Sequence, residues 1–150
     1  ARIYKVRNYL NDEPFMLTYG DGLSDINLDA LLAYHRSKNL TVTVTGVRPP
    51  ARFGELQIDS DGIASGFNEK PQASAGMISG GFFVCEPAVF DHMNSQENLV
   101  FEQDPMQSLV GEKLLAVYQH DGFWQCMDTF RDWQLLNSMI DQEKAPWKVW

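Results

Sequence analysis

Two aspartates follow apolar stretches, at positions where an α/β sheet commonly carries the side chains that bind ligands. Asp21 lies between two glycines, directly after the almost unbroken apolar run at residues 15–19 (FMLTY), and Asp128 follows the apolar stretch at 123–127 (FWQCM). In open α/β sheets, ligands bind outside the carboxyl ends of the strands. A carboxylate in such a loop could hold a divalent cation, because Mg²⁺ favours one or two protein carboxylates together with phosphate oxygens and water.

A second interpretation of Asp21 stays open from the residues alone: its carboxylate could cap the helix that follows or shape the turn. Asp128 favours the metal interpretation, since it occupies a similar position between an apolar stretch and a predicted helix. A pair of carboxylates at two strand ends would suffice for a magnesium site beside phosphates.

The elements that must position the aspartates begin with a strand, a helix and a second strand. The run at 15–19 is apolar enough for a strand covered on both faces. Ser24 or Asp25 can cap a helix at 28–38, whose leucines recur at helical spacing. Residues 40–47 (LTVTVTGV) alternate and are rich in β-branched side chains, which predicts the second strand. The short joints predict a right-handed βαβ unit with a parallel pair of strands.

The middle of the chain is predicted to be mostly β. A hairpin turn at 60–62 (SDG) joins predicted strands at 55–59 and 63–67. The remaining expected elements are helices at 2–10, 87–93, 104–111 and 129–143, strands at 78–85 and 114–118, and an extended segment at 123–127. We therefore expect an α/β fold, a single domain over residues 1–150, with a mainly parallel sheet and a β-rich insertion.

Composition limits the classes of protein and partner. The chain has 150 residues, of which 44% are hydrophobic, and contains no run of 18 apolar residues that would predict a membrane span. Its two cysteines, Cys85 and Cys126, lie far apart in apolar surroundings, which favours two buried free thiols and a cytoplasmic protein. The net charge of -8 argues against a nucleic-acid partner but allows a nucleotide as a small ligand.

Six motifs, in the same order, resemble those of sugar-1-phosphate nucleotidylyltransferases. They are YGDG (19–22), RPPARFG (48–54), FNEKP (67–71), ISGGFFV (78–84), FWQCMDT (123–129) and KAPWKVW (144–150). The motifs are most similar to those of the cytidylyl branch, the glucose-1-phosphate cytidylyltransferases, and the resemblance covers essentially the whole chain. It implies part of a nucleotide-diphospho-sugar transferase (Rossmann-like) fold.

The resemblance also implies roles for particular residues. Asp21 and Asp128 match the aspartates that hold Mg²⁺ against the nucleotide phosphates, so Mg²⁺ is the implied cofactor. Glu69 matches a residue that binds sugar hydroxyls, and Lys70 matches a catalytic lysine that binds the sugar phosphate. From the residues alone, Lys70 could equally be an ordinary exposed lysine and Glu69 a surface charge at a strand end.

Further implied contacts to substrate involve mostly backbone. By resemblance, Arg2 contacts the nucleotide, and the backbone passes close to the substrate at four glycines: Gly20, Gly54, Gly80 and Gly81. Two positions depart from the family pattern, because Asn68 stands where glutamine is expected and Cys126 where proline is common. Neither change removes a charge that the chemistry needs.

The implied reaction joins CTP and a sugar 1-phosphate, specifically glucose 1-phosphate, to give CDP-glucose and diphosphate. The sugar-phosphate oxygen attacks the α-phosphorus in line, so no protein nucleophile is needed, and catalysis rests on positioning and charge neutralisation. The requirements are a cation between the two anions and a lysine on the acceptor phosphate.

One family motif does not occur in this sequence. The family begins with a glycine-rich loop, G-G-x-G-T-R, followed by a lysine, which binds the triphosphate; these 150 residues contain no such loop. The resemblance therefore identifies the chain as the C-terminal part of such an enzyme. We expect the chain to be inactive alone, and the alternative is a non-catalytic module from a truncated gene that binds sugar phosphate or oligomerises.

Removing the first half of a doubly wound sheet would expose a strand edge and an apolar face. The strand at 15–19 would border the missing segment, and exposed strand edges pair with other chains. Four aromatic residues add surface whose burial the sequence leaves open: Phe82, Phe83, Phe123 and Trp124. We expect a homo-oligomer, with a two-fold dimer favoured. The alternative is a monomer in which the helices at 28–38 and 129–143 fold back over the sheet.

Overall fold

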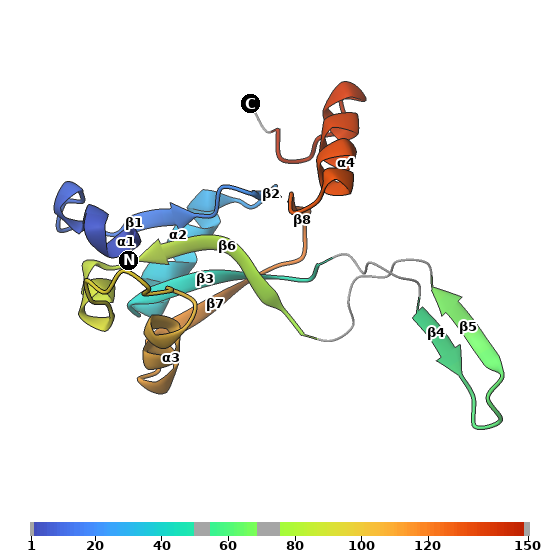
Figure 1. Cartoon of the computed structure of the whole chain (residues 1–150), viewed down its shortest axis with the longest axis horizontal. Coiled ribbons are helices and arrows are strands. Elements are labelled where there is room, and N and C mark those ends of the chain that lie inside the picture. Colours follow the sequence, from blue (N-terminus) through green and yellow to red (C-terminus); the bar gives the residue numbers. More distant parts are fainter. Residues whose placement is uncertain (1, 50–54, 69–75, 149–150) are drawn as a thin grey trace.

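The computed structural model describes residues 2–49, 55–68 and 76–148, and Figure 1 shows the arrangement of its elements. In chain order these are α1 (Arg2–Val6), the 3₁₀ helix η1 (Arg7–Tyr9), β1 (Phe15–Thr18), β2 (Gly22–Ser24), α2 (Leu28–Lys38), β3 (Val42–Val47), β4 (Glu55–Ile58), β5 (Ala64–Asn68), β6 (Ile78–Cys85), the 3₁₀ helix η2 (Pro87–His92), α3 (Asp104–Gly111), β7 (Leu115–His120), β8 (Trp124–Cys126) and α4 (Phe130–Asp141). No described helix is long and apolar enough to cross a membrane.

The main sheet has four strands in the order β1-β6-β3-β7. β3 lies parallel to β7, whereas β6 lies antiparallel to both β1 and β3. The α/β class is confirmed, and three of the four strands point the same way in a mixed sheet. The direct pairing expected between β1 and β3 is wrong, because β6 lies between them. The α2 connection spans two strand positions, which a βαβ pattern in sequence does not reveal.

The core lies around the two central strands. Every residue of β3 is buried, and Phe83, Val84 and Cys85 of β6 are each almost completely buried. On one side the strands pack against Val89 and Leu109, which belong to the cluster that forms the main core. Of the buried threonines in β3, Thr43 contacts His35, whereas Oγ1 of Thr45 is buried without a hydrogen-bond partner among the described residues.

α2 is fastened to the sheet by a buried histidine. His35 is 1% exposed. Its Nδ1 lies 2.8 Å from Oγ1 of Thr43 in β3, and its Nε2 lies 3.1 Å from Oε1 of Glu86, just after β6. The helix therefore makes a polar contact with both central strands as well as the apolar contact of Leu31.

Local signals predicted most element positions, with corrections at several ends. α2 is capped by Asn27, whose side chain accepts from the Ala30 amide at 2.9 Å, and the predicted cap at Ser24 or Asp25 is wrong. Instead, the Ser24 side chain donates a hydrogen bond to the Phe123 carbonyl just before β8, and the Asp25 side chain accepts one from His120 at the end of β7. The helix expected at 2–10 is a short α-helix followed by a 3₁₀ turn, and the one expected at 87–93 is 3₁₀ throughout.

The expected β-rich insertion is present as the antiparallel β4–β5 hairpin. Figure 1 shows this hairpin apart from the four-stranded sheet, whereas the short strands β2 and β8 lie between that sheet and α4. Neither β2 nor its pairing with β8 was predicted. This two-stranded ladder carries the candidate site.

Candidate active site at the β2–β8 ladder

The two predicted metal-binding aspartates lie at the same end of the β2–β8 ladder. The strands pair antiparallel, from Ser24 opposite Trp124 to Gly22 opposite Cys126. One more backbone hydrogen bond extends the pairing, because the amide of Met127 donates to the carbonyl of Asp21 at 2.8 Å. Asp21 thus lies opposite Met127, one position beyond the last paired residues, and Asp128 is the residue after Met127. Both aspartates are exposed.

Gly80 of β6 is the point at which the β2–β8 ladder contacts the main sheet. The indole Nε1 of Trp124 donates to the carbonyl of Gly80 at 2.8 Å. A Cβ on Gly80 would lie 2.8 Å from Cγ1 of Val47 and 3.4 Å from the same indole nitrogen. A larger residue would therefore crowd Val47 in β3, whereas its contact with the indole of β8 would be ordinary packing.

Gly81 holds the end of β1 in a similar way. Its φ is +78°, and a Cβ would lie 2.5 Å from Cδ2 of Tyr19. The Tyr19 amide donates to the Gly81 carbonyl at 3.0 Å, and its hydroxyl donates to Glu102. Partial burial, together with this carboxylate, raises the pKa of the Tyr19 hydroxyl, so it remains a hydrogen-bond donor. The chain just before Asp21 is therefore held by β6 and by the loop before α3.

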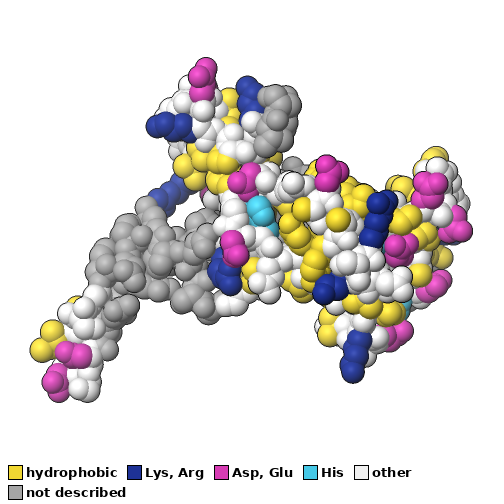
Figure 2. Space-filling model, turned by 180° about the vertical axis from the view of Figure 1, so that it is seen from behind, with side chains coloured by type: hydrophobic (Ala, Val, Ile, Leu, Met, Phe, Trp, Pro, Cys, Tyr) yellow, Lys and Arg dark blue, Asp and Glu magenta, His cyan; other side chains and the backbone are white. Residues whose placement is uncertain are grey.

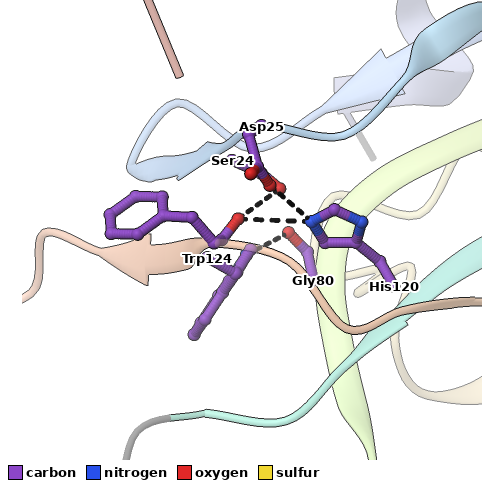
Figure 3. A network of polar contacts seen from close by, with 6 residues as sticks. Ser24, Asp25, Gly80, His120 and Trp124 are labelled. Carbon is purple, nitrogen blue, oxygen red and sulfur yellow. Dashed lines mark hydrogen bonds and ion pairs between the residues drawn. The ribbon is translucent and has the colours of Figure 1, made fainter. Parts of the chain in front are cut away.

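A polar cluster closes the other end of the ladder (Figure 3). The Phe123 carbonyl accepts from Oγ of Ser24 at 2.8 Å and from the amide of Asp25 at 3.3 Å. Nε2 of His120, the last residue of β7, lies 2.9 Å from Oδ1 of Asp25. β2, β7 and β8 are joined at this point. The sequence did not predict this cluster, although the turn glycine Gly122, two positions after His120, was a usable signal.

The donor set fits a magnesium ion that receives its other ligands from phosphate and water. Among the described residues, neither Asp21 nor Asp128 belongs to an ion pair. The described residues contain no cluster of three or more potential metal ligands, and Asp21 and Asp128 are the candidate carboxylates among them. Two hard oxygen donors beside an anionic substrate suit Mg²⁺, which keeps several waters.

Cys126 lies beside one of the two carboxylates. Its Sγ donates to Oδ2 of Asp128 at 3.3 Å, and burial, together with the Asp128 charge, raises the pKa of this thiol. Both cysteines are free, as expected. Cys85 is buried, but Cys126 is only half-buried, so the expectation of two buried thiols is wrong for Cys126.

The remaining predicted site residues are distributed as follows. Gly20 is exposed, with nothing within 4 Å of a Cβ built on it. Arg2 begins α1, where the neighbouring Tyr4 contacts Phe90, which stacks on Phe15 at the start of β1. The structure therefore places Asp21 and Asp128 at one end of a ladder that contacts Gly80 and follows the segment bonded to Gly81, and it places Arg2 at the opposite end of β1. Gly54, Glu69 and Lys70 lie outside the described residues.

Charged side chains show no concentration of one sign on the face drawn in Figure 2. Lysines and arginines are scattered singly among acidic and apolar side chains on the coloured part of that face. The coloured part of this face therefore offers no broad basic surface to a phosphate.

Known sequences and structures are similar to this chain over nearly its full length. It is 45% identical over 150 residues to a probable glucose-1-phosphate cytidylyltransferase of Bacillus subtilis (strain 168), and 40% identical over 151 residues to the glucose-1-phosphate cytidylyltransferase of Salmonella typhi. Each match includes 100% of this chain and 58% of the relative. The chain thus spans somewhat more than half the length of these relatives.

Solved structures confirm the fold. A putative glucose-1-phosphate thymidylyltransferase from Bacillus anthracis matches with a TM-score of 0.64 at 15% identity, over 91% of this chain and 58% of that one. HddC from Yersinia pseudotuberculosis matches with a TM-score of 0.65 at 17% identity, over 92% and 60%. The expected similarity to the nucleotide-diphospho-sugar transferase fold is therefore confirmed. The sequence model of the nucleotidyl transferases matches residues 2–141, and the chain therefore belongs to the nucleotidyl transferase family.

Proposed function

We propose that this chain provides the metal-binding and sugar-phosphate-binding part of a site that converts CTP and glucose 1-phosphate to CDP-glucose and diphosphate. One observation carries the proposal: the β2–β8 ladder brings Asp21 and Asp128 to one end, beside the Gly80–Gly81 backbone. The 40–45% identity to glucose-1-phosphate cytidylyltransferases supports the choice of nucleotide and sugar. The free thiols Cys85 and Cys126 support a cytoplasmic location.

Each residue has a task that suits its chemistry. Asp21 and Asp128 hold Mg²⁺, which neutralises charge between the two phosphate-bearing substrates when it is bound. Lys70 binds the acceptor phosphate and Glu69 binds sugar hydroxyls. The Gly80 and Gly81 backbone is proposed to border the sugar phosphate, because it lies beside the ladder that carries Asp21 and Asp128. No side chain is required as a nucleophile, because the sugar phosphate itself attacks.

The 150-residue chain on its own is proposed to be inactive. Its sequence contains no G-G-x-G-T-R loop, whose backbone N–H groups would bind the triphosphate. Binding CTP in the reactive geometry needs those donors as well as the metal. The complete reaction is therefore proposed to need a triphosphate-binding loop in addition to these 150 residues.

A second candidate function is a non-catalytic module that binds sugar phosphate or forms oligomers. The observation that favours it is the position of β1 at the edge of the main sheet. Beside β1 is a mostly apolar groove, which is lined by Met16, Leu17, Thr18, Leu28, Leu31, Phe82 and Phe83. An edge strand next to apolar surface is suited to pairing with another chain.

A chimera tests the enzymatic proposal. In this design the chain replaces the matching segment of the Bacillus subtilis relative, so the unmatched part of that relative supplies the rest of the site. We expect CDP-glucose formation from CTP, glucose 1-phosphate and Mg²⁺, and its loss in Asp21→Asn. Asp12→Asn, an exposed aspartate before β1, is the matched control and should retain activity. A folded chimera without activity would contradict the proposal, and diphosphate release by the isolated chain would contradict its inactivity.

A further inference from the structure

His120 donates one hydrogen atom toward two acceptors from different segments. Its Nε2 lies 2.9 Å from Oδ1 of Asp25 and 3.3 Å from the carbonyl oxygen of Phe123. A carboxylate and a carbonyl both accept, so Nε2 carries the proton that is shared between them. The imidazole is mostly shielded from solvent, with its side chain 13% exposed. A hydrogen bond to a carboxylate in such surroundings is among the stronger kinds.

The contact fastens a ladder that is too short to be stable alone. β2 and β8 contribute three residues each, and two strands alone, even when joined as a hairpin, are at best marginally stable in water. The closed end of the ladder is the Ser24–Trp124 pair, adjacent to the His120 contact (Figure 3). The open end carries Asp21 and Asp128. Contacts at the closed end therefore help to hold the register of the two aspartates.

The turn between His120 and Phe123 is built to allow this contact. A Cβ on Gly122 would lie 2.5 Å from Oδ1 of Asp25 and 2.7 Å from Cε1 of His120. Both overlapping atoms are at the ends of side chains, so a Cβ would displace Asp25 and His120 and disturb their 2.9 Å contact. The backbone φ of Gly122 is not positive, so glycine is not needed here for its conformation. It is needed because a side chain would collide with the His120–Asp25 pair.

We propose that His120 is a positioning residue for the metal site: through Asp25 and Phe123 it holds β2 against β8 and so holds Asp21 and Asp128 in register. His120 touches neither aspartate. The assignment of the metal site rests on the proposed function, but the coupling between His120 and the ladder does not. Loss of the Nε2–H donor loosens the open end of the ladder and weakens binding of a divalent cation there.

The first test measures hydrogen exchange at the Met127 amide, which reports the rung next to Asp21. His120→Leu should raise its exchange rate roughly tenfold or more, as expected for loss of a hydrogen bond to a charged group. His120→Gln keeps an N–H donor at the corresponding position and should restore slow exchange. His92→Leu, a matched change at η2, should have no effect on this amide. Amides of β3 serve as an internal reference for global stability.

The second test measures Mn²⁺-induced broadening of amide resonances around Asp21 and Asp128 in the same 150-residue chain. His120→Leu should shift the broadening to several-fold higher Mn²⁺ concentrations, and His120→Gln should restore it. Unchanged exchange and unchanged broadening in His120→Leu would overturn the proposal. If the wild-type chain shows no broadening while Met127 exchange still responds to His120, the metal function fails and the coupling stands.

A third variant covers the case in which His120→Leu does not fold. Gly122→Ala leaves both polar side chains in place but drives a methyl group between them. It should speed exchange at Met127 in the same direction as His120→Leu. A folded Gly122→Ala protein with wild-type exchange at Met127 would overturn the proposal independently.

Discussion

The backbone carbonyl of Asp21 accepts a hydrogen bond from the amide of Met127, 2.8 Å away. This bond extends the ladder by one rung and brings Asp128, the next residue, to the same end as Asp21. The two carboxylates come from positions 107 residues apart (128 minus 21). The position of both residues at one end of the ladder depends on only three paired positions.

The first prediction is that both carboxylates contribute to one cation site. Asp21→Asn and Asp128→Asn should each weaken Mn²⁺ binding by about tenfold or more, since a charge-assisted contact to a metal is lost. The double variant should be little worse than the weaker-binding single variant, because the two act as a unit. Asp12→Asn is the control. Mn²⁺ titration followed by electron paramagnetic resonance measures the affinities, and additive independent losses would indicate separate sites.

The second prediction concerns the sugar phosphate. Glucose 1-phosphate should bind the isolated chain with a dissociation constant on the order of a millimolar, about 4 kcal/mol, because one charged pair and a few hydrogen bonds suffice for that. An NMR titration should shift the amides of Gly80 and Gly81, and Lys70→Ala should abolish the shifts. Lys113→Ala, at an exposed position after α3, is the control. No shift at tens of millimolar ligand would leave only the oligomerising module.

The sequence could predict the parts of this site that depend on neighbouring residues, but not the parts that depend on contacts between segments far apart in the chain. The main strands and α2 follow from local apolar patterns, and strand ends were enough to single out Asp21 and Asp128. The β2–β8 pairing was missed because each strand has three residues, and its stabilising contacts join segments about a hundred positions apart, such as Ser24 and Phe123. Periodicity carries no information about such pairings.

The order of strands was likewise beyond local patterns. β6 was predicted as a strand from its apolar run, but its insertion between β1 and β3 depends on cross-strand packing, including Phe83 at 1% exposure. The cap of α2 was mispredicted for a related reason. Asp25 was a suitable cap by residue type, yet its carboxylate is bound by His120 from the end of β7.

The third prediction concerns Gly81. Gly81→Ala should lower the free energy of unfolding by about 2 kcal/mol, since alanine must adopt a positive φ and its Cβ overlaps the Tyr19 ring. Gly111→Ala is the matched control, because no atom lies within 4 Å of a Cβ there and its φ is not positive. Urea denaturation measures both variants. Equal stabilities would show that the close contact with Tyr19 has no cost.

The fourth prediction is a loss of stability at alkaline pH. Burial, and next to it the Glu86 carboxylate, raises the pKa of the Cys85 thiol from 9.0 to about 12. Above pH 9 the unfolded chain loses this proton while the folded chain keeps it, so the folded state binds more protons and stability falls as pH rises from about 9 towards 12.

The slope from one such group is at most about 1.4 kcal/mol per pH unit. Urea midpoints at about pH 8 and about pH 10 should differ more for the wild-type chain than for Cys85→Ala. Cys126→Ala is the comparison, because Cys126 is only half-buried and should alter the slope less. If Cys85→Ala showed the same pH dependence of stability as the wild-type chain, Cys85 would not be its source.

The last prediction concerns assembly of the 150-residue chain. β1 forms one edge of the main sheet, and Met16 on β1 and Leu28 on α2 are 46% and 47% exposed beside the apolar groove. Two copies can satisfy both features at once, because antiparallel pairing of two β1 edges is two-fold symmetric and brings the two grooves together. We therefore expect a dimer at tens of micromolar protein.

A double variant, Met16→Lys with Leu28→Lys, should dissociate this dimer by placing like charges across the shared surface. Val110→Lys, at a 60% exposed position on α3, is the control and should remain dimeric. Light scattering after size-exclusion chromatography measures the mass; the mass of a single chain for the wild-type protein would contradict the dimer and favour a monomer with a free β1 edge.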